Sequence, residues 1–233
     1  MLRNVLSLLL FVSVASGCAS RGAVDDPVVR SFTWFSYVGG EDIKAVCAPG
    51  ASDRYRFVYN GVWDEQVRTY DVAGSATGQG AIAKARVFGE FDLRNFALNS
   101  PQSVWQGASS RASLTEDAFD TLRRIVAESP FEEPTPDGKF LRSDEFYWAV
   151  SACRGGRFHF NAWTGDMAGF DQLPFFDLLL PLDDTNVAVN PPRKLYLGPF
   201  QNVPQRFRTA GSATQYFQLQ VGENGLRLGP TFF

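Results

Sequence analysis

The single histidine of the chain, His159, lies in the segment RFHFNAW. Side chains of an extended strand alternate between faces, so Arg157, His159 and Asn161 share one face, and Phe158 and Phe160 share the other. The three polar side chains form a candidate binding surface. His159 could also act as a general base, but neither a GxSxG motif nor a reactive cysteine accompanies it. The sequence therefore predicts no catalytic residue.

Carboxylates could supply acid–base chemistry, and they occur as three close pairs, Asp64 with Glu65, Glu90 with Asp92, and Asp183 with Asp184. Glycoside hydrolysis needs two carboxylates that face one cleft, about 5–9 Å apart. Asp64 and Glu65 are adjacent on an expected strand and point to opposite faces. Glu90 and Asp92 share a face with lysine and arginine, which predicts a solvated surface, and the third pair is typical of a turn or helix cap. A cell-wall or glycan hydrolase remains the alternative function.

Three cysteines are present, Cys18, Cys47 and Cys153. Cys47 and Cys153 form an even pair, which predicts a disulfide in an oxidising compartment; two buried free thiols are the alternative. Two cysteines and one histidine are too few ligands for a zinc site, so no metal is expected. The sequence also lacks the glycine motifs of nucleotide-binding loops, so no cofactor is predicted.

The first seventeen residues have the composition of an export signal. Arg3 precedes an apolar run of eleven residues, Val5 to Ala15, which is too short to cross a hydrocarbon core of about 30 Å as a helix. The small residues Ala15, Ser16 and Gly17 then lead to Cys18. This end resembles the bacterial lipobox, although the family usually has leucine where Ala15 stands. Cleavage of an ordinary signal peptide after Ala19 and an uncleaved anchor are the alternatives.

The lipobox resemblance implies a signal peptide over residues 1–17 and acyl chains, such as palmitate, on Cys18. Two or more chains give stable membrane anchoring. Residues 18–29 are then a tether, and residues 30–233 are expected to form a single globular domain. Ala19, in place of the aspartate that favours inner-membrane retention in the family, implies the periplasmic side of the outer membrane.

Alternating polar and apolar residues predict most of the domain to be strands. The expected strands are Ser31 to Val38, Asp42 to Cys47, Ala81 to Arg94, Ser103 to Ser113, Glu145 to Cys153 and Arg157 to Thr164. Asn60-Gly61 predicts a two-residue hairpin turn that pairs Val58 with Trp63 and Arg56 with Glu65. Asn224-Gly225 predicts a second hairpin.

One segment has clear helix signals. Thr115 is a good N-cap, acidic residues follow it, apolar residues recur at helical spacing, and Pro130 ends the pattern. The sequence thus predicts an α+β fold, a mainly antiparallel sheet with one helix at about 115–129 packed on it. Gly169 to Leu180 is either a second short helix or an extended run. Residues 103–164, with LTEDAFDTLRRIVAESPF before EFYWAVSACRGGRFHFNAW, resemble emfourin-type inhibitor domains in their order of elements, which implies a protease inhibitor as another alternative.

Composition limits the partners. The chain of 233 residues is 45% hydrophobic and has a formal net charge of −3, so a sizeable core is expected and nucleic acid is not an expected partner. The sequence favours a non-enzymatic, lipid-anchored module that contacts the membrane through Cys18 and binds an envelope protein or a cell-wall component. Besides the Arg157–His159 face, the aromatic segments Thr33 to Tyr37 and Tyr55 to Tyr59 are candidate surfaces, with core packing as their alternative.

Overall fold

A computed structural model of the chain describes residues 34–75, 79–89, 107–195, 217–227 and 231–232. The signal segment, Cys18, the tether and the pair Glu90 and Asp92 lie outside the described residues. Within the described part, no helix is both long and apolar enough to span a membrane.

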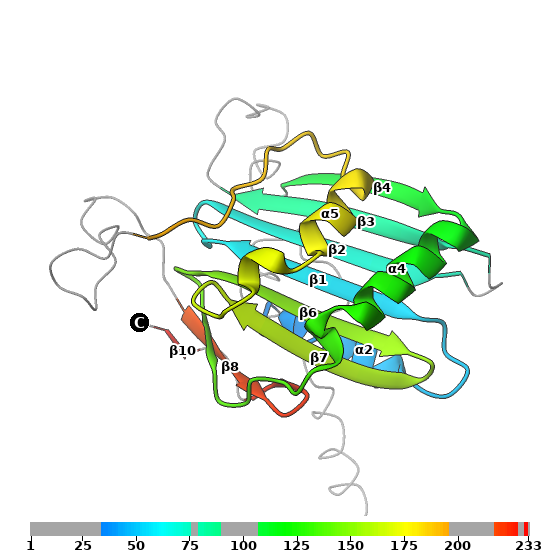
Figure 1. Ribbon diagram of the computed structural model, residues 1–233, viewed down its shortest axis with the longest axis horizontal. Coiled ribbons are helices and arrows are strands. Elements are labelled where there is room, and N and C mark those ends of the chain that lie inside the picture. The colour runs from blue at the N-terminus through cyan, green and yellow to red at the C-terminus, as the bar shows by residue number, and fades with distance from the viewer. Residues whose placement is uncertain (1–33, 76–78, 90–106, 196–216, 228–230, 233) are drawn as a thin grey trace, which may run out of the picture.

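Six strands form the main sheet in the order β4-β3-β2-β1-β6-β7, and each neighbouring pair is antiparallel (Figure 1). They are β1 (Arg54–Gly61), β2 (Gln66–Gly74), β3 (Ala81–Gly89), β4 (Ala108–Leu114), β6 (Phe146–Arg154) and β7 (Arg157–Thr164). The predicted mainly antiparallel α+β class is therefore confirmed. Both β6 and β7 lie where the alternation of the sequence placed them. The part of the third expected strand beyond Gly89, and residues 103–106 of the fourth, lie outside the described residues.

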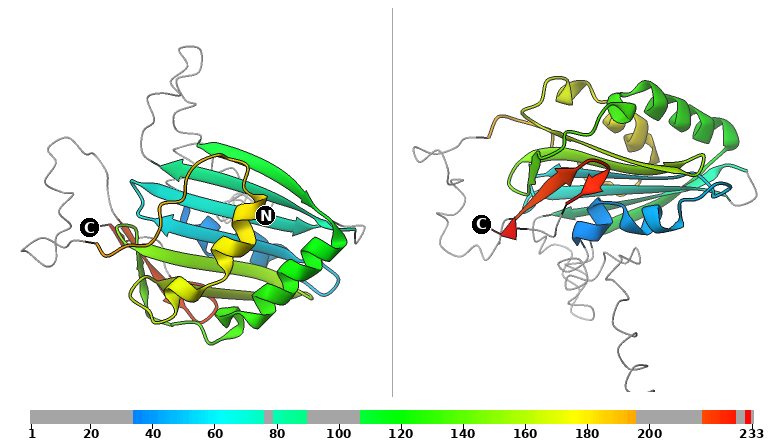
Figure 2. Two further views of the ribbon diagram at one scale, coloured as in Figure 1. Left: turned by 45° about the horizontal axis from the view of Figure 1, so that its top comes forward. Right: turned by 90° about the horizontal axis from the view of Figure 1, so that it is seen from below.

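Elements cover both faces of this sheet, as Figure 2 shows. On one face lie α4 (Glu116–Glu128), α5 (Phe175–Leu179) and the short 3-10 turns η2 (Pro130–Glu132), η3 (Phe170–Gln172) and η4 (Leu180–Leu182). On the other lie helical residues 34–38, α2 (Glu41–Val46) and a small second sheet. That sheet contains β5 (Phe140–Arg142), β8 (Phe217–Gly222) and β10 (Thr231–Phe232), and β9 (Gly225–Leu226) pairs with β8.

The helix α4 confirms the strongest helix prediction. The Thr115 side chain accepts a hydrogen bond from the backbone N–H of Ala118, which satisfies one amide of the first turn. Phe119, Leu122 and Val126 are buried against the sheet at helical spacing. The run from Gly169 to Leu180 is helical rather than extended, since it contains η3 and α5.

The N-terminal pair of strands was predicted wrongly. Residues 34–38 are helical, and residues 41–46 form α2. Trp34, Tyr37 and Val38 are buried together, and their i, i+3, i+4 spacing is the signature of one helix face. The two helical segments meet at Gly40, whose φ of 70° favours glycine.

The hairpin of β1 and β2 is present, but its predicted register is wrong. Asn60 lies inside β1 opposite Val67, and Arg56 is opposite Asp71 rather than Glu65. The turn follows Gly61 because Asn60 is anchored elsewhere: its buried amide donates to the carbonyls of Ser143 at 3.0 Å and Glu145 at 2.6 Å. These tertiary hydrogen bonds outweigh the local preference of Asn-Gly for a turn. The C-terminal hairpin is also present, with Gly222 paired to Gly225.

Cys47 and Cys153 form the predicted disulfide, with Cα atoms 5.5 Å apart. Cys47 directly follows α2 and Cys153 lies near the end of β6, so the bridge ties the N-terminal helix to the main sheet. The element on the N-terminal side of the bridge is a helix, where the sequence predicted a strand.

Candidate functional site

The three polar residues of β7 share a face, as the alternation predicted, and this face is the one that α4 and η2 cover. Their environments differ along the strand. Arg157 is exposed, His159 is half-buried, and Asn161 is buried. The structure therefore places only the first two where a ligand can reach them.

A pocket of about 160 Å³ opens at this end of β7. Its lining, which defines what we call the β7 pocket, consists of Phe131, Glu132, Ala152, Arg154, Arg157, Phe158 and His159. Ala152 lies on β6, directly between Tyr55 of β1 and His159 of β7. Because alanine carries only a methyl group, it leaves space between these two larger neighbours.

His159 is held by the turn η2. Its Nε2 lies 2.7 Å from the carbonyl oxygen of Phe131, and the two rings meet edge to face with centroids 4.9 Å apart. A carbonyl oxygen only accepts hydrogen bonds, so Nε2 is the protonated nitrogen in this arrangement. Nδ1 is then the nitrogen that can exchange a proton or accept a hydrogen bond.

Two arginines give the pocket its charge. Arg154 and Arg157 lie opposite each other across the turn Gly155-Gly156, where both glycines have positive φ as a type I′ turn requires. Arg154 Nη1 is buried and forms an ion pair of 3.0 Å with Glu132 Oε1, and it has no hydrogen-bond partner among the described residues. Arg157 has neither an ion pair nor a side-chain hydrogen bond with the described residues. Two guanidinium groups and one carboxylate leave the lining with one net positive charge.

The hydroxyl of Tyr55 adds an unused polar group to this region. The Tyr55 side chain is almost completely buried, and its hydroxyl has no hydrogen-bond partner among the described residues. Burial raises the pKa of Tyr55, Asp53 raises it further, and the positive charges of Arg154 and Arg123 oppose the rise. Tyr55 is the β1 partner of Ala152, which belongs to the pocket lining. Tyr55 was predicted only as part of the candidate surface Tyr55 to Tyr59, and its place beside Ala152 comes from the pairing of β1 with β6.

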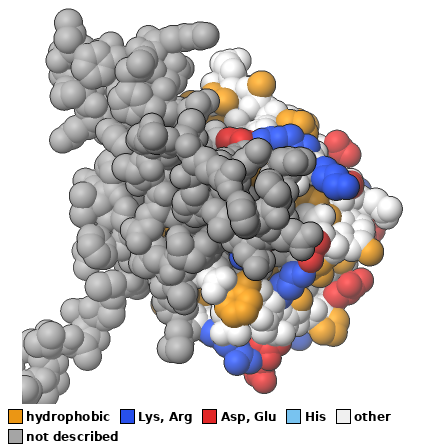
Figure 3. Space-filling model, turned by 90° about the vertical axis from the view of Figure 1, so that its left-hand side faces the viewer, with side chains coloured by type: hydrophobic (Ala, Val, Ile, Leu, Met, Phe, Trp, Pro, Cys, Tyr) orange, Lys and Arg blue, Asp and Glu red, His pale blue; other side chains and the backbone are white. Residues whose placement is uncertain are grey.

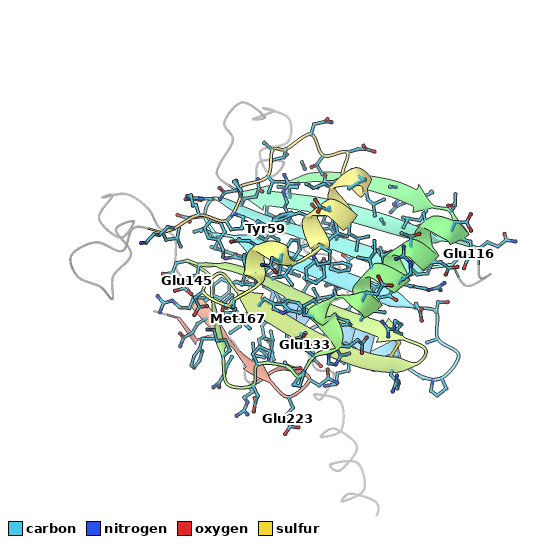
Figure 4. All side chains as sticks on the ribbon, viewed as in Figure 1. Tyr59, Glu116, Glu133, Glu145, Met167 and Glu223 are labelled. Carbon is cyan, nitrogen blue, oxygen red and sulfur yellow. A yellow bond between two sulfur atoms is a disulfide. The ribbon has the colours of Figure 1, made fainter. Side chains whose placement is uncertain are left out.

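Asn161 connects β7 to the turn η2. Its amide nitrogen lies within hydrogen-bond distance of the carbonyls of Pro130, Phe131 and Glu133, and its oxygen accepts from the N–H of Ala162. Glu133, labelled in Figure 4, directly follows η2. Asn161 thus fixes the turn that forms one wall of the pocket.

The same strand is an edge of the sheet, and side chains from other elements occupy its outer hydrogen-bonding groups. The Asn224 side chain accepts from the N–H of Phe160 and donates to the carbonyl of Phe158. The Thr135 hydroxyl donates to the carbonyl of Phe160. An edge occupied in this way does not readily accept another strand, so the candidate binding feature of β7 is the pocket rather than the strand edge.

We expect Asn161→Ala to lower the free energy of unfolding by about 2–3 kcal/mol, because three carbonyls lose a shared donor and a buried N–H loses its acceptor. Urea unfolding followed by tryptophan fluorescence measures the change. Gln172→Ala is the matched control, since Gln172 is exposed and an amide removed there should change stability by less than about 0.5 kcal/mol. Equal stability of the two variants would contradict the role of Asn161.

The other candidates from the sequence do not join this pocket. Asp183 pairs with Arg68 inside the protein, and Glu65 pairs with Arg193. The aromatic rings of Trp34, Tyr37, Tyr55, Phe57 and Tyr59 are buried in the core rather than displayed. On the face in Figure 3, basic and acidic side chains of the described residues are interspersed. Among the described residues, no group of three or more histidine, cysteine or acidic side chains is arranged to hold a metal ion.

The fold and the pocket define a disulfide-linked α+β domain with a small cationic, aromatic-lined pocket at one end of its sheet. No protein-family model, no curated protein and no solved structure matches the chain.

Proposed function

We propose that the chain is a lipid-anchored envelope protein with a non-enzymatic binding role at the periplasmic side of the outer membrane. The observation that carries the proposal is the disulfide between Cys47 and Cys153. Disulfides persist in oxidising compartments such as the bacterial periplasm and are rare in the cytosol. A bridge within the folded domain therefore supports export, which the apolar leader before Cys18 independently favours.

The lipid anchor rests on the third cysteine. Cys18 follows three small residues at the end of the leader, and the folded domain uses the other two cysteines for its bridge. Acylation of Cys18 would hold the domain at the membrane surface through the tether of residues 18–29. Two acyl chains give stable anchoring, where a single chain is marginal.

The binding role is supported by the β7 pocket. It combines the aromatic wall of Phe131 with two arginines, one of them without an ion partner among the described residues. Small-molecule sites typically combine apolar walls with a few polar groups that fix the orientation of the ligand. A domain that displays this pocket at a membrane surface is suited to bind a component of the envelope.

Removal of the Cys18 thiol tests the anchor. We expect intact-mass spectrometry of the protein from its native envelope to show loss of residues 1–17 and added acyl chains, and Cys18→Ala to abolish both. Because the variant keeps the apolar leader of residues 1–17, the loss of the anchor is measured by its mass, which should lack the acyl chains.

Two matched variants sharpen this test. Cys47→Ala also removes a cysteine, and with it the disulfide, but it should keep the lipid and the wild-type partitioning into detergent. Ala19→Asp should keep the lipid and move the protein to the inner-membrane fraction, as the lipoprotein resemblance implies. Retention of residues 1–17, or an unmodified Cys18 in the wild-type protein, would overturn the proposed anchor.

A further inference from the structure

We infer that the β7 pocket binds a small ligand that carries one carboxylate on a flat apolar body. This inference deepens the binding role proposed above and does not depend on the lipid anchor. It follows from the charges, the size and the unused hydrogen-bonding groups of the pocket.

The charge of the lining favours a monoanion. Arg154 and Arg157 contribute two positive charges, and Glu132 contributes one negative charge. The planar guanidinium group binds a carboxylate through two parallel hydrogen bonds. Arg157 is exposed at the mouth of the pocket without an ion pair among the described residues. A doubly charged anion would be repelled by Glu132, so one carboxylate fits the lining better than a phosphate dianion does.

The size and walls of the pocket favour a flat apolar body. Phe131 lies on its wall, and the methyl group of Ala152 lies between larger neighbours, whereas the Phe158 ring packs on the opposite face of β7. Its volume of about 160 Å³ is close to that of an apolar cavity of about 150 Å³ that binds benzene in another protein. A six-membered ring with a carboxylate is therefore a suitable probe of the site.

One buried donor of the lining adds to this charge. Arg154 Nη1 is buried, has Glu132 Oε1 as its ion partner at 3.0 Å, and makes no hydrogen bond with the described residues. Buried donors in native proteins usually have a hydrogen-bond partner. A carboxylate between the two arginines would provide an acceptor for Arg154.

The NMR signal of His159 serves to measure ligand binding in the pocket. His159 is the single histidine of the chain, so the NMR signal of its Hε1 proton can be assigned without ambiguity. The full-length protein in detergent is titrated at constant pH with benzoate, with the uncharged benzamide and with inorganic phosphate. We expect a saturable shift with millimolar benzoate, and at least about tenfold weaker responses to benzamide and to phosphate, because each charged hydrogen bond contributes about 1.5–3 kcal/mol.

Arg157→Gln should weaken benzoate binding about tenfold, since the exposed guanidinium contributes at the lower end of this range. Arg111→Gln is the matched control, because Arg111 is also exposed without an ion pair among the described residues but lies on β4, at the opposite edge of the sheet. It should bind benzoate as the wild type does. Absence of a saturable benzoate shift, equal affinity for benzamide, tighter binding of phosphate, or an unchanged affinity in Arg157→Gln overturns the inference.

The two proposals fail separately. A protein that lacks the acyl chains but binds benzoate as described contradicts the envelope anchor and leaves the ligand assignment standing. An acylated protein that does not bind benzoate contradicts the ligand assignment alone.

Discussion

Loss of the Cys47–Cys153 disulfide is expected to lower the free energy of unfolding by about 4.7 kcal/mol, the value of the chain-entropy treatment for a loop of about 100 residues. The two cysteines are 106 positions apart, and the loop between them contains strands β1 to β5, α4 and most of β6. Without the bridge, the unfolded chain gains the conformational freedom of this whole loop. Such a loss is a large share of the stability of an ordinary domain, about 5–15 kcal/mol.

The double variant Cys47→Ala/Cys153→Ala measures this effect without mixed disulfides. Its urea midpoint should fall, and the slope of its unfolding free energy against urea should rise, because an unbridged chain exposes more surface when it unfolds. Cys18→Ala serves as the control for cysteine removal and should keep the wild-type midpoint. If the double variant and the wild type unfold at the same urea concentration, the bridge does not stabilise the domain.

The parts of the fold that the sequence predicted well are those where local and tertiary preferences agree. In α4, the local signal of the Thr115 cap and the tertiary burial of Phe119, Leu122 and Val126 favour the same helix. In β6 and β7, the Gly155-Gly156 turn has the positive φ angles that its glycines favour, so the register of the hairpin follows from its own sequence.

Where a distant contact opposes the local signal, the sequence was misleading. Asn60-Gly61 is a strong turn signal, yet the Asn60 amide binds carbonyls more than eighty positions away, and this shifts the turn along the chain. The aromatic residues after Thr33 were interpreted by their strand propensity, whereas Trp34, Tyr37 and Val38 have the spacing of a helix face. Helical periodicity was the available signal there.

The candidate site was found only in part for the same reason. Alternation alone placed Arg157 and His159 on one face, and the two-glycine turn could also have paired Arg154 with Arg157. Phe131 and Glu132 come from η2, which the chain reaches after α4 has crossed the sheet. No local pattern connects them with β7, so their place beside His159 depends on tertiary packing.

The second large effect is expected at Arg68, whose side chain is 1% exposed. Its guanidinium forms an ion pair of 2.6 Å with Asp183, whose side chain is 2% exposed. Burial alone would raise the pKa of Asp183, but hydrogen bonds from Thr185 and Tyr70, with the charge of Arg68, hold it below its usual value. Asp183 is therefore ionised at neutral pH. Arg68→Met should lower the free energy of unfolding by about 3–5 kcal/mol, because it leaves this carboxylate buried without its cation.

Arg68 also anchors the segment that follows η4. Its guanidinium donates to the carbonyl of Val187 and to the side chain of Gln66, which in turn donates to the carbonyl of Ala188. Hydrogen exchange around residues 183–190 should therefore increase in Arg68→Met more than exchange elsewhere in the domain, since this segment has no regular backbone ladder of its own.

Two further variants distinguish the effect of losing the buried ion pair from the general effect of removing an arginine. Arg124→Met removes an exposed arginine that pairs with Glu128 along α4, and it should cost no more than about 0.5 kcal/mol. Arg68→Met/Asp183→Leu removes both charges, so it should recover part of the stability that the single variant loses, because no unpaired charge remains buried. A double variant less stable than Arg68→Met would mean that Tyr70 and Thr185 already satisfy Asp183. The role of Arg68 would then be to hold the segment at Val187 rather than to neutralise the carboxylate.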